Sequence, residues 1–147
     1  MSVVKLLKRI VAPSEVDLGR KSEENVKAST MHDHTYGINS DPLTQFSCVL
    51  SALIHDLDHP GVPNAQLVIE QTDLAKVYMN QSVAEKNSVD LAWNLLMDAK
   101  YRVLRQTIYQ TETEKCRFRS LVVNSVMATD IVDKELKAMR NRRWDTA

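Results

Sequence analysis

Apolar residues recur along this chain at steps of three and four, the spacing of one face of an α-helix. The clearest example follows Asp41-Pro42, where a residue suited to cap a helix precedes a proline suited to its first turn. The apolar positions of this segment are Leu43, Phe46, Val49, Leu50, Leu53 and Ile54. Because the alternating pattern of strands is nearly absent, the sequence predicts an all-α domain with several helices.

Shorter helices are expected around this central one. A helix over about residues 3–10 should stop before Pro13, and residues 12–40 are rich in charges, which indicates a long surface loop or insertion. Further short helices are expected from about Pro63 and through Leu74 to Tyr78.

Three longer helical patterns follow. Ser82 is placed to cap a helix that runs through Trp93, and Glu85 lies three residues later, the spacing of a capping box. The remaining patterns predict helices from about Thr111 to Thr129 and from Val132 toward Trp144.

Composition narrows the class of protein. In 147 residues, 19 Lys and Arg balance 19 Asp and Glu, so nothing in the net charge indicates a nucleic-acid polymer as partner or contact with an anionic membrane. The only cysteines, Cys48 and Cys116, lie in amphipathic segments, which favours reduced thiols in the cytoplasm. The apolar stretch at the N-terminus is too short and too interrupted by charges to span a membrane. We therefore expect an intracellular, cytoplasmic chain and leave open a membrane-associated parent protein.

His55 and Asp56 are the first candidates for chemistry, because they are adjacent at the end of the best apolar helix. An imidazole and a carboxylate suit a zinc-like ion and a harder ion side by side, and an aspartate can bridge two metals that activate water for phosphoryl attack. By itself, however, such a pair more often stabilises the C-terminus of a helix. His59 shares a face with His55 only if the helix continues to that point, and Asp58 is placed to orient an imidazole.

The surrounding sequence favours metal binding by His55 and Asp56 over a role at the helix end. The run HDLDHPGVPN at residues 55–64 closely resembles the signature of class I 3′,5′-cyclic-nucleotide phosphodiesterases, a branch of the HD hydrolase superfamily. Two later segments are similar to the same family in the same order, YMNQSVAEKNSVDLAWNLL at residues 78–96 and VVNSVMATDIVDK at residues 122–134. The chain is therefore identified as part of such a catalytic domain, with an all-α fold of the HD type.

The resemblance implies a role for each matching residue. His55 and Asp56 match metal ligands, with Asp56 touching both of two divalent ions, Zn²⁺ and Mg²⁺ or Mn²⁺. His59 matches a pocket histidine, and Glu85 matches a carboxylate that hydrogen-bonds metal-bound solvent. Asp130, after Ala128-Thr129, matches an acid of the substrate pocket, although a Thr-Asp pair at a helix end can also serve only as a cap. Catalytic roles are thus expected for Asp56, His59 and Glu85, and a substrate contact for Asp130.

The chain also departs from the family pattern. Where the family usually has Glu-Asn-His-His, this chain has Glu85-Lys86-Asn87-Ser88, which puts the exact setting of the carboxylate in doubt, and Gln66 replaces a residue that is usually apolar. The upstream motif H-N-x-x-H, which supplies an acid and a metal ligand in the family, is missing, as are the later metal-binding aspartate and the residues that grip the base. We therefore expect 1–147 to be one partial catalytic domain, with the remainder of that domain as its partner.

His32 and His34 are the only other histidines, and they do not match the missing motif because one residue separates them instead of three. They are expected to be solvated loop residues. The activity implied by the resemblance is hydrolysis of cyclic AMP or cyclic GMP to the 5′-nucleotide by a hydroxide that two metals activate, with little or no activity in this chain alone. Two alternatives stay open, another nucleotide hydrolase of the HD superfamily and a helical regulatory module that has lost catalysis.

Overall fold

The computed structural model describes residues 3–10, 38–132 and 138, and within these ranges the secondary structure is entirely helical. This agrees with the all-α prediction. The chain divides into two compact units, residues 1–49 and 50–147, which are described separately. The expected polar loop, His32 and His34, and most of the helix expected from Val132 lie outside the described residues.

The first unit contains α1 (Val3–Ile10), the 3-10 helix η1 (Ile38–Ser40) and the beginning of α3 (Pro42–Ile54). Asp41 caps α3 as expected, because its Oδ1 accepts hydrogen bonds from the backbone N–H groups of Leu43 (3.2 Å) and Thr44 (3.3 Å). The hydroxyl of Thr44 donates to the other carboxylate oxygen. The sequence signal for this helix start is therefore confirmed.

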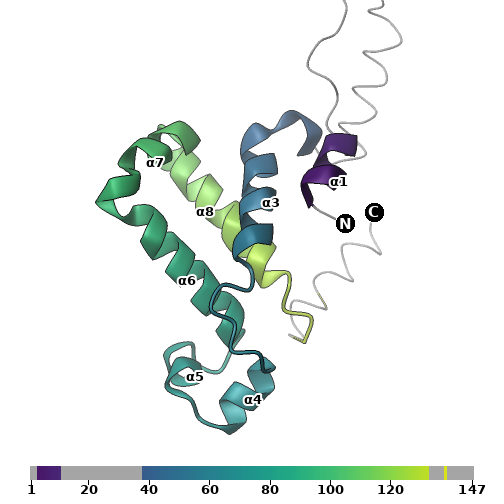
Figure 1. The fold of residues 1–147 in the computed structure, drawn as a ribbon, viewed down its shortest axis with the longest axis vertical. Helices are drawn as coiled ribbons and strands as arrows, with labels where there is room; N and C mark the ends of the chain where they lie inside the picture. The colour runs from purple at the N-terminus through teal and green to yellow at the C-terminus, as the bar shows by residue number, and fades with distance from the viewer. Residues whose placement is uncertain (1–2, 11–37, 133–137, 139–147) are drawn as a thin grey trace, which may run out of the picture. The chain divides into compact units, whose positions relative to one another are not determined.

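The second unit begins with the end of α3 and then follows the order α4 (Asn64–Ile69), α5 (Asp73–Val77), α6 (Val83–Met97), the 3-10 helix η2 (Ala99–Tyr101), α7 (Arg102–Ile108) and α8 (Glu112–Met127). Helices α6 and α8 lie side by side and are connected through α7, whereas α4 and α5 pack against the start of α6 (Figure 1). Helix α6 is therefore the element on which the second unit is assembled.

Three details differ from the sequence prediction. Helix α3 ends at Ile54, before Pro60 and Gly61, because residues 55–58 form a turn. Ser82 precedes α6 but makes no capping hydrogen bond with its side chain, since its backbone is left-handed (φ 43°). Helix α7 was not predicted. Its apolar residues Val103 and Leu104 are 70% and 47% exposed, and none of its residues is buried, so no apolar face marks it in the sequence.

The core between α6 and α8 is built around Phe118, which is 0% exposed. The rings of Trp93 and Tyr109 lie 6.1 and 6.0 Å from the Phe118 ring, centroid to centroid, in tilted arrangements that favour aromatic contact. Val122 and Val126 continue the same buried stripe along α8. These residues hold the long helices together.

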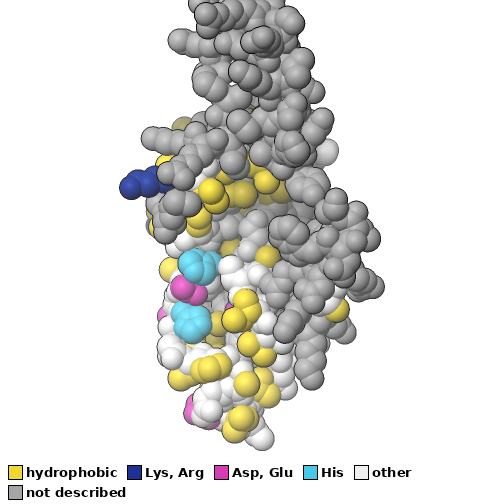
Figure 2. Space-filling model, turned by 90° about the vertical axis from the view of Figure 1, so that its right-hand side faces the viewer, with side chains coloured by type: hydrophobic (Ala, Val, Ile, Leu, Met, Phe, Trp, Pro, Cys, Tyr) yellow, Lys and Arg dark blue, Asp and Glu magenta, His cyan; other side chains and the backbone are white. Residues whose placement is uncertain are grey.

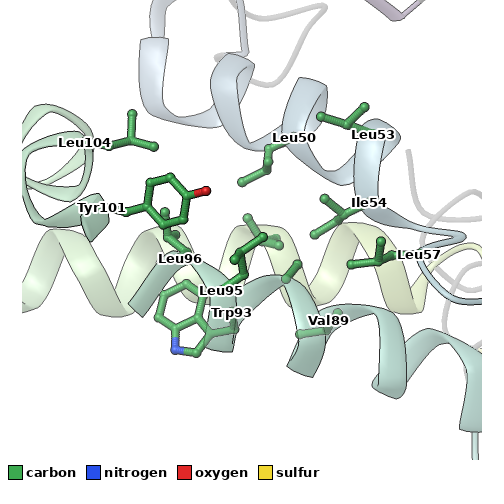
Figure 3. Close-up of a pocket in the computed structure, with 12 residues that line it drawn as sticks. Leu50, Leu53, Ile54, Leu57, Val89, Trp93, Leu95, Leu96, Tyr101 and Leu104 are labelled. Carbon is green, nitrogen blue, oxygen red and sulfur yellow. The ribbon is translucent and has the colours of Figure 1, made fainter. Parts of the chain in front are cut away.

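An apolar cavity of about 390 Å³ lies in the second unit, between the end of α3, α6 and α7 (Figure 3). Its lining is almost wholly aliphatic and aromatic: Leu50, Leu53, Ile54, Leu57, Val89, Ala92, Trp93, Leu95, Leu96, Tyr101, Leu104 and Val122. Leu53 is 80% exposed and Leu95 is 52% exposed.

The start of α8 has the capping box that α6 lacks. The Thr111 hydroxyl accepts from the Glu114 backbone N–H (3.2 Å), and the Glu114 carboxylate accepts from the N–H groups of Gln110 (2.8 Å) and Thr111 (3.1 Å). These backbone hydrogen bonds lower the pKa of Glu114. The stabilisation is therefore present above the carboxyl's unfolded pKa and is lost as the pH falls through the lower folded value.

Helices α4 and α5 both end in Schellman motifs without glycine. After α4, the N–H of Gln71 donates to Val68 O (3.1 Å) and the N–H of Thr72 to Leu67 O (3.2 Å), and Gln71 has a left-handed backbone (φ 51°). After α5, Met79 takes the same place with φ 53°. A residue with a Cβ in this conformation costs about 1–2 kcal/mol, so each motif carries local strain.

Replacement of Phe118 by alanine should lower the free energy of unfolding by about 3–5 kcal/mol, because it leaves a cavity between α6 and α8. The neighbouring exposed Cys116→Ala variant is the control and should change stability by less than about 0.5 kcal/mol. Urea unfolding curves of both variants provide the comparison. A loss below about 1 kcal/mol for Phe118→Ala would mean that this core is not formed as described.

Replacement of Gln71 by glycine should raise the free energy of unfolding by about 0.5–1 kcal/mol, because glycine adopts positive φ without steric cost. Gln71→Ala keeps the Cβ and should give no gain. Thermal melting of the three proteins under one condition tests this, and a lower melting temperature for the glycine variant contradicts a Schellman ending at α4.

Candidate functional site

The turn that follows α3 carries the first two candidate residues. His55 lies one residue past the last helical residue, and its side chain is 39% exposed, whereas that of Asp56 is 66% exposed. Figure 2 shows the histidine side chains on one face of the molecule with an acidic side chain between them. The ligand-type groups of the turn are therefore open to solvent and to small ions.

The hydrogen bonds of His55 define which of its nitrogens can act as a ligand. Its Nδ1 lies 3.1 Å from the carbonyl oxygen of Ala52, an acceptor, so Nδ1 carries the proton of the neutral ring. Its Nε2 lies 3.0 Å from Oδ2 of Asp56. Two lone pairs then face each other, and either a second proton on the ring or a cation between the two atoms removes their repulsion.

This pair fits part of a divalent metal site. Imidazole nitrogen and carboxylate oxygen are ligands of zinc, magnesium and manganese. Adjacent ligands that lie about 2.1 Å from one octahedral ion are about 3 Å apart, which is the spacing of Nε2 and Oδ2. Within the described ranges, however, no group of three or more His, Cys, Asp or Glu side chains is placed to hold an ion. The described residues thus offer one imidazole nitrogen and one carboxylate oxygen at the spacing of neighbouring metal ligands.

His59 does not share a helical face with His55. The helix has ended, and Asp58 has a left-handed backbone with φ 56°, so the chain reverses between the two histidines. Nδ1 of His59 accepts the backbone N–H of Gly61 (3.0 Å), which leaves the proton of the neutral ring on Nε2. His59 is exposed and can donate this proton in a hydrogen bond to an anionic group.

Glu85 and Asp130 are brought together by a third residue, Asn64. The Asn64 amide nitrogen donates to Oε2 of Glu85 (2.8 Å) and to Oδ2 of Asp130 (3.4 Å). Its carbonyl oxygen accepts the backbone N–H of Ala84 (2.9 Å), and because that N–H is only a donor, the orientation of the amide is unambiguous. Glu85 therefore pairs with Asn64 instead of forming the capping box expected with Ser82.

Asp130 also has a local structural role. Its Oδ1 accepts the N–H of Val132 (3.0 Å), and the hydroxyl of Thr129 donates to Val126 O (2.7 Å) at the end of α8. Thr129 is thus engaged with the helix end. Asp130 is buried, with 6% exposure, and reaches both the local turn and Asn64.

Sequence reasoning assigned no role to Asn64, Asn87 or Ser88. Asn87 Nδ2 donates to Oδ2 of Asp58 (3.2 Å), and Ser88 Oγ donates to the carbonyl oxygen of Leu57 (2.7 Å). The signal for Asn64 was its place at the end of the 55–64 run, and the signal for the other two was their departure from the family pattern. The structure therefore attaches both groups of candidate residues to the first two turns of α6.

None of the described helices is long and apolar enough to cross a membrane. The cavity of Figure 3 is also separate from the candidate residues, since its lining includes neither the His55–Asp56 pair nor the Glu85–Asn64–Asp130 group. The candidate residues thus form two polar groups at one end of α6, an exposed turn and a less exposed group that includes the buried Asp130.

Comparisons with known proteins agree with the motif. Residues 26–141 match the family model described as 3′5′-cyclic nucleotide phosphodiesterase. The chain is 35% identical over 109 residues to the cGMP-inhibited 3′,5′-cyclic phosphodiesterase 3A of Rattus norvegicus, a match that covers 71% of this chain and 9% of the relative.

Two invertebrate proteins are also similar. A probable 3′,5′-cyclic-AMP phosphodiesterase of Caenorhabditis elegans is 30% identical over 89 residues, covering 60% of this chain and 13% of the relative. The dual specificity calcium/calmodulin-dependent 3′,5′-cyclic nucleotide phosphodiesterase 1 of Drosophila melanogaster is 30% identical over 97 residues, covering 65% and 11%. The chain thus spans only 9–13% of the length of these relatives. With most of its length matched by the family model, the chain belongs to the 3′,5′-cyclic nucleotide phosphodiesterase family.

Proposed function

We propose that residues 1–147 form part of the catalytic domain of an enzyme that hydrolyses 3′,5′-cyclic AMP or cyclic GMP to the 5′-nucleotide in cyclic-nucleotide signalling. Membership of the family supports this activity. The observation that links this activity to particular residues is the 3.0 Å distance between His55 Nε2 and Asp56 Oδ2. Two acceptor atoms this close need a cation or a proton between them. The remainder of the domain is proposed to complete the ligand set and to bind the base.

His55 and Asp56 are the residues proposed to hold metal. Two divalent ions, Zn²⁺ and Mg²⁺ or Mn²⁺, would supply Lewis acidity toward the phosphoryl group and activate water when bound. The Ala52 carbonyl keeps the proton of His55 on Nδ1 and thereby leaves Nε2 free to act as a ligand. His59 presents an Nε2–H donor that can bind the anionic phosphate oxygen of the substrate.

The Glu85–Asn64–Asp130 group is proposed to act on solvent and substrate. Both N–H bonds of the Asn64 amide point toward carboxylates, so this neutral side chain holds two acids close to each other without adding charge. Glu85 keeps a second carboxylate oxygen to accept a proton or hydrogen bond from water. Asp130, buried beside it, is proposed to contribute to the substrate pocket.

A second candidate is a helical interaction module without catalysis. The observation in its favour is the apolar cavity beside α6 and α7, together with the two-ligand limit in the described part of the chain. The genomic sequence upstream of the Met1 codon separates the candidates. An open frame that encodes H-N-x-x-H supports the enzyme, whereas an in-frame stop with transcript support contradicts it.

The chain should bind Mn²⁺ weakly through His55 and Asp56. Replacement of Asp56 by asparagine should weaken this binding at least about tenfold, because it removes the charged ligand. The paramagnetic resonance signal of free Mn²⁺ in a titration measures the effect. Asp73→Asn, at an exposed acid on α5, is the matched control and should bind as the unaltered chain does. Equal binding by all three proteins would contradict the proposed metal ligands.

Replacement of Asn64 by aspartate should destabilise the protein by about 2–4 kcal/mol at pH 7, because it removes two donors and places a third carboxylate beside Glu85 and Asp130. Crowded carboxylates retain protons in the folded state that the unfolded chain releases, so the loss should grow as the pH rises from 5 to 8. Urea unfolding at several pH values measures this trend.

The control for this variant is Asn94→Asp, which makes the same chemical change at an exposed position on α6. Its effect should stay within about 0.5 kcal/mol at every pH. If Asn64→Asp behaves like Asn94→Asp, the Asn64 amide does not hold the two acids together.

A further inference from the structure

Two neighbouring residues of α6, Asn87 and Ser88, bind two neighbouring residues of the turn after α3. The Asn87 amide donates to the Asp58 carboxylate (3.2 Å), and the Ser88 hydroxyl donates to the Leu57 carbonyl oxygen (2.7 Å). Ser88 is 0% exposed and Asn87 is buried as well. Because a buried donor that loses its partner costs free energy, these two buried side chains hold the turn through their hydrogen bonds.

The turn needs such an attachment because its own backbone is strained. Asp58 has φ 56°, a left-handed conformation that aspartate tolerates better than most residues but that still costs some free energy. The turn's own backbone hydrogen bonds run from His55 N–H to Ser51 O (2.9 Å), from Leu57 N–H to Ile54 O (2.9 Å) and from His59 N–H to Asp56 O (3.1 Å). His55, Asp56 and His59 are all on this short segment.

The attachment uses residues in which this chain departs from its family. Asn87 and Ser88 stand where the family pattern has two histidines, so the sequence alone suggested a loss of polar contacts near Glu85. In the structure their polar groups are instead directed to the turn, while Glu85, on the preceding turn of α6, is held by Asn64. One helix thus holds the acid group and the turn in one arrangement.

We propose that Asn87 and Ser88 are positioning residues that hold the 55–59 turn in the conformation in which His55 and Asp56 face one another as ligands. They act through Asp58 and Leu57, to which their side chains donate hydrogen bonds. The part of this inference that concerns metal rests on the proposed function, whereas the hold on the turn does not.

The test compares three single variants and one double variant of the full chain. Ser88→Ala removes the donor to Leu57, and Asn87→Asp removes the donor to Asp58 and places two carboxylates together. The matched control is Ser51→Ala, which removes another buried hydroxyl that donates to a distant carbonyl, that of Val122 (3.5 Å). Amide hydrogen exchange of Leu57 and His59 is measured against that of α6 and α8, and Mn²⁺ binding is measured by paramagnetic resonance.

Ser88→Ala and Asn87→Asp should each raise the amide exchange rate at Leu57 and His59 at least about tenfold more than in α8. Each should also weaken Mn²⁺ binding about tenfold. Combining Asn87→Asp with Asp58→Asn exchanges donor and acceptor, so this double variant should recover most of both losses. Ser51→Ala should change neither quantity selectively.

Unchanged exchange at the turn in Ser88→Ala, a uniform increase along the whole second unit, or failure of the donor–acceptor exchange to rescue would each overturn the positioning role. If the unaltered chain takes up no Mn²⁺, the proposed metal site fails. The exchange rates and the rescue then decide the positioning role by themselves.

Discussion

Buried polar groups must be hydrogen-bonded, and in the first two turns of α6 this requirement joins elements that are far apart in the sequence. Asn87 and Ser88 are buried on a helix whose own backbone bonds are already made, so their side chains find partners outside it. Those partners are Asp58 and Leu57, in the turn that bears His55 and Asp56. The hydrogen bonds that these two buried side chains need therefore attach α6 to the turn that bears the candidate metal ligands.

The same end of α6 locates the acids. The backbone N–H of Ala84 lies in the first turn of α6, where helical N–H groups have no helical partner, and Asn64 accepts from it. This contact takes the place of a side-chain cap by Ser82, whose left-handed backbone and lack of a capping bond would otherwise leave the helix start unsupported. Asn64 thereby caps a helix and aligns two carboxylates with a single amide group.

The apolar part of the second unit has a different character. Phe118 and its neighbours bury a compact stripe between α6 and α8. The adjoining cavity shares Trp93 and Val122 with this core, but its lining also includes Leu53, which is mostly exposed. Leu57 lines this cavity, and its carbonyl oxygen is also the acceptor for Ser88. Leu57 thus contributes its side chain to the cavity and its carbonyl oxygen to the hydrogen bond that holds the turn.

The sequence by itself determined the helical fold, the start of α3 at Asp41-Pro42 and the family, because helical periodicity, capping residues and a run such as 55–64 are local properties of the chain. It also pointed to Glu85 and Asp130 but could not show that they meet, because the atom that joins them belongs to Asn64, 21 residues before the one and 66 before the other. The early end of α3 and the left-handed Asp58 were likewise hidden. Asp58 bonds to Asn87 and its neighbour Leu57 bonds to Ser88, and only tertiary structure brings residues so distant in the chain within hydrogen-bond reach.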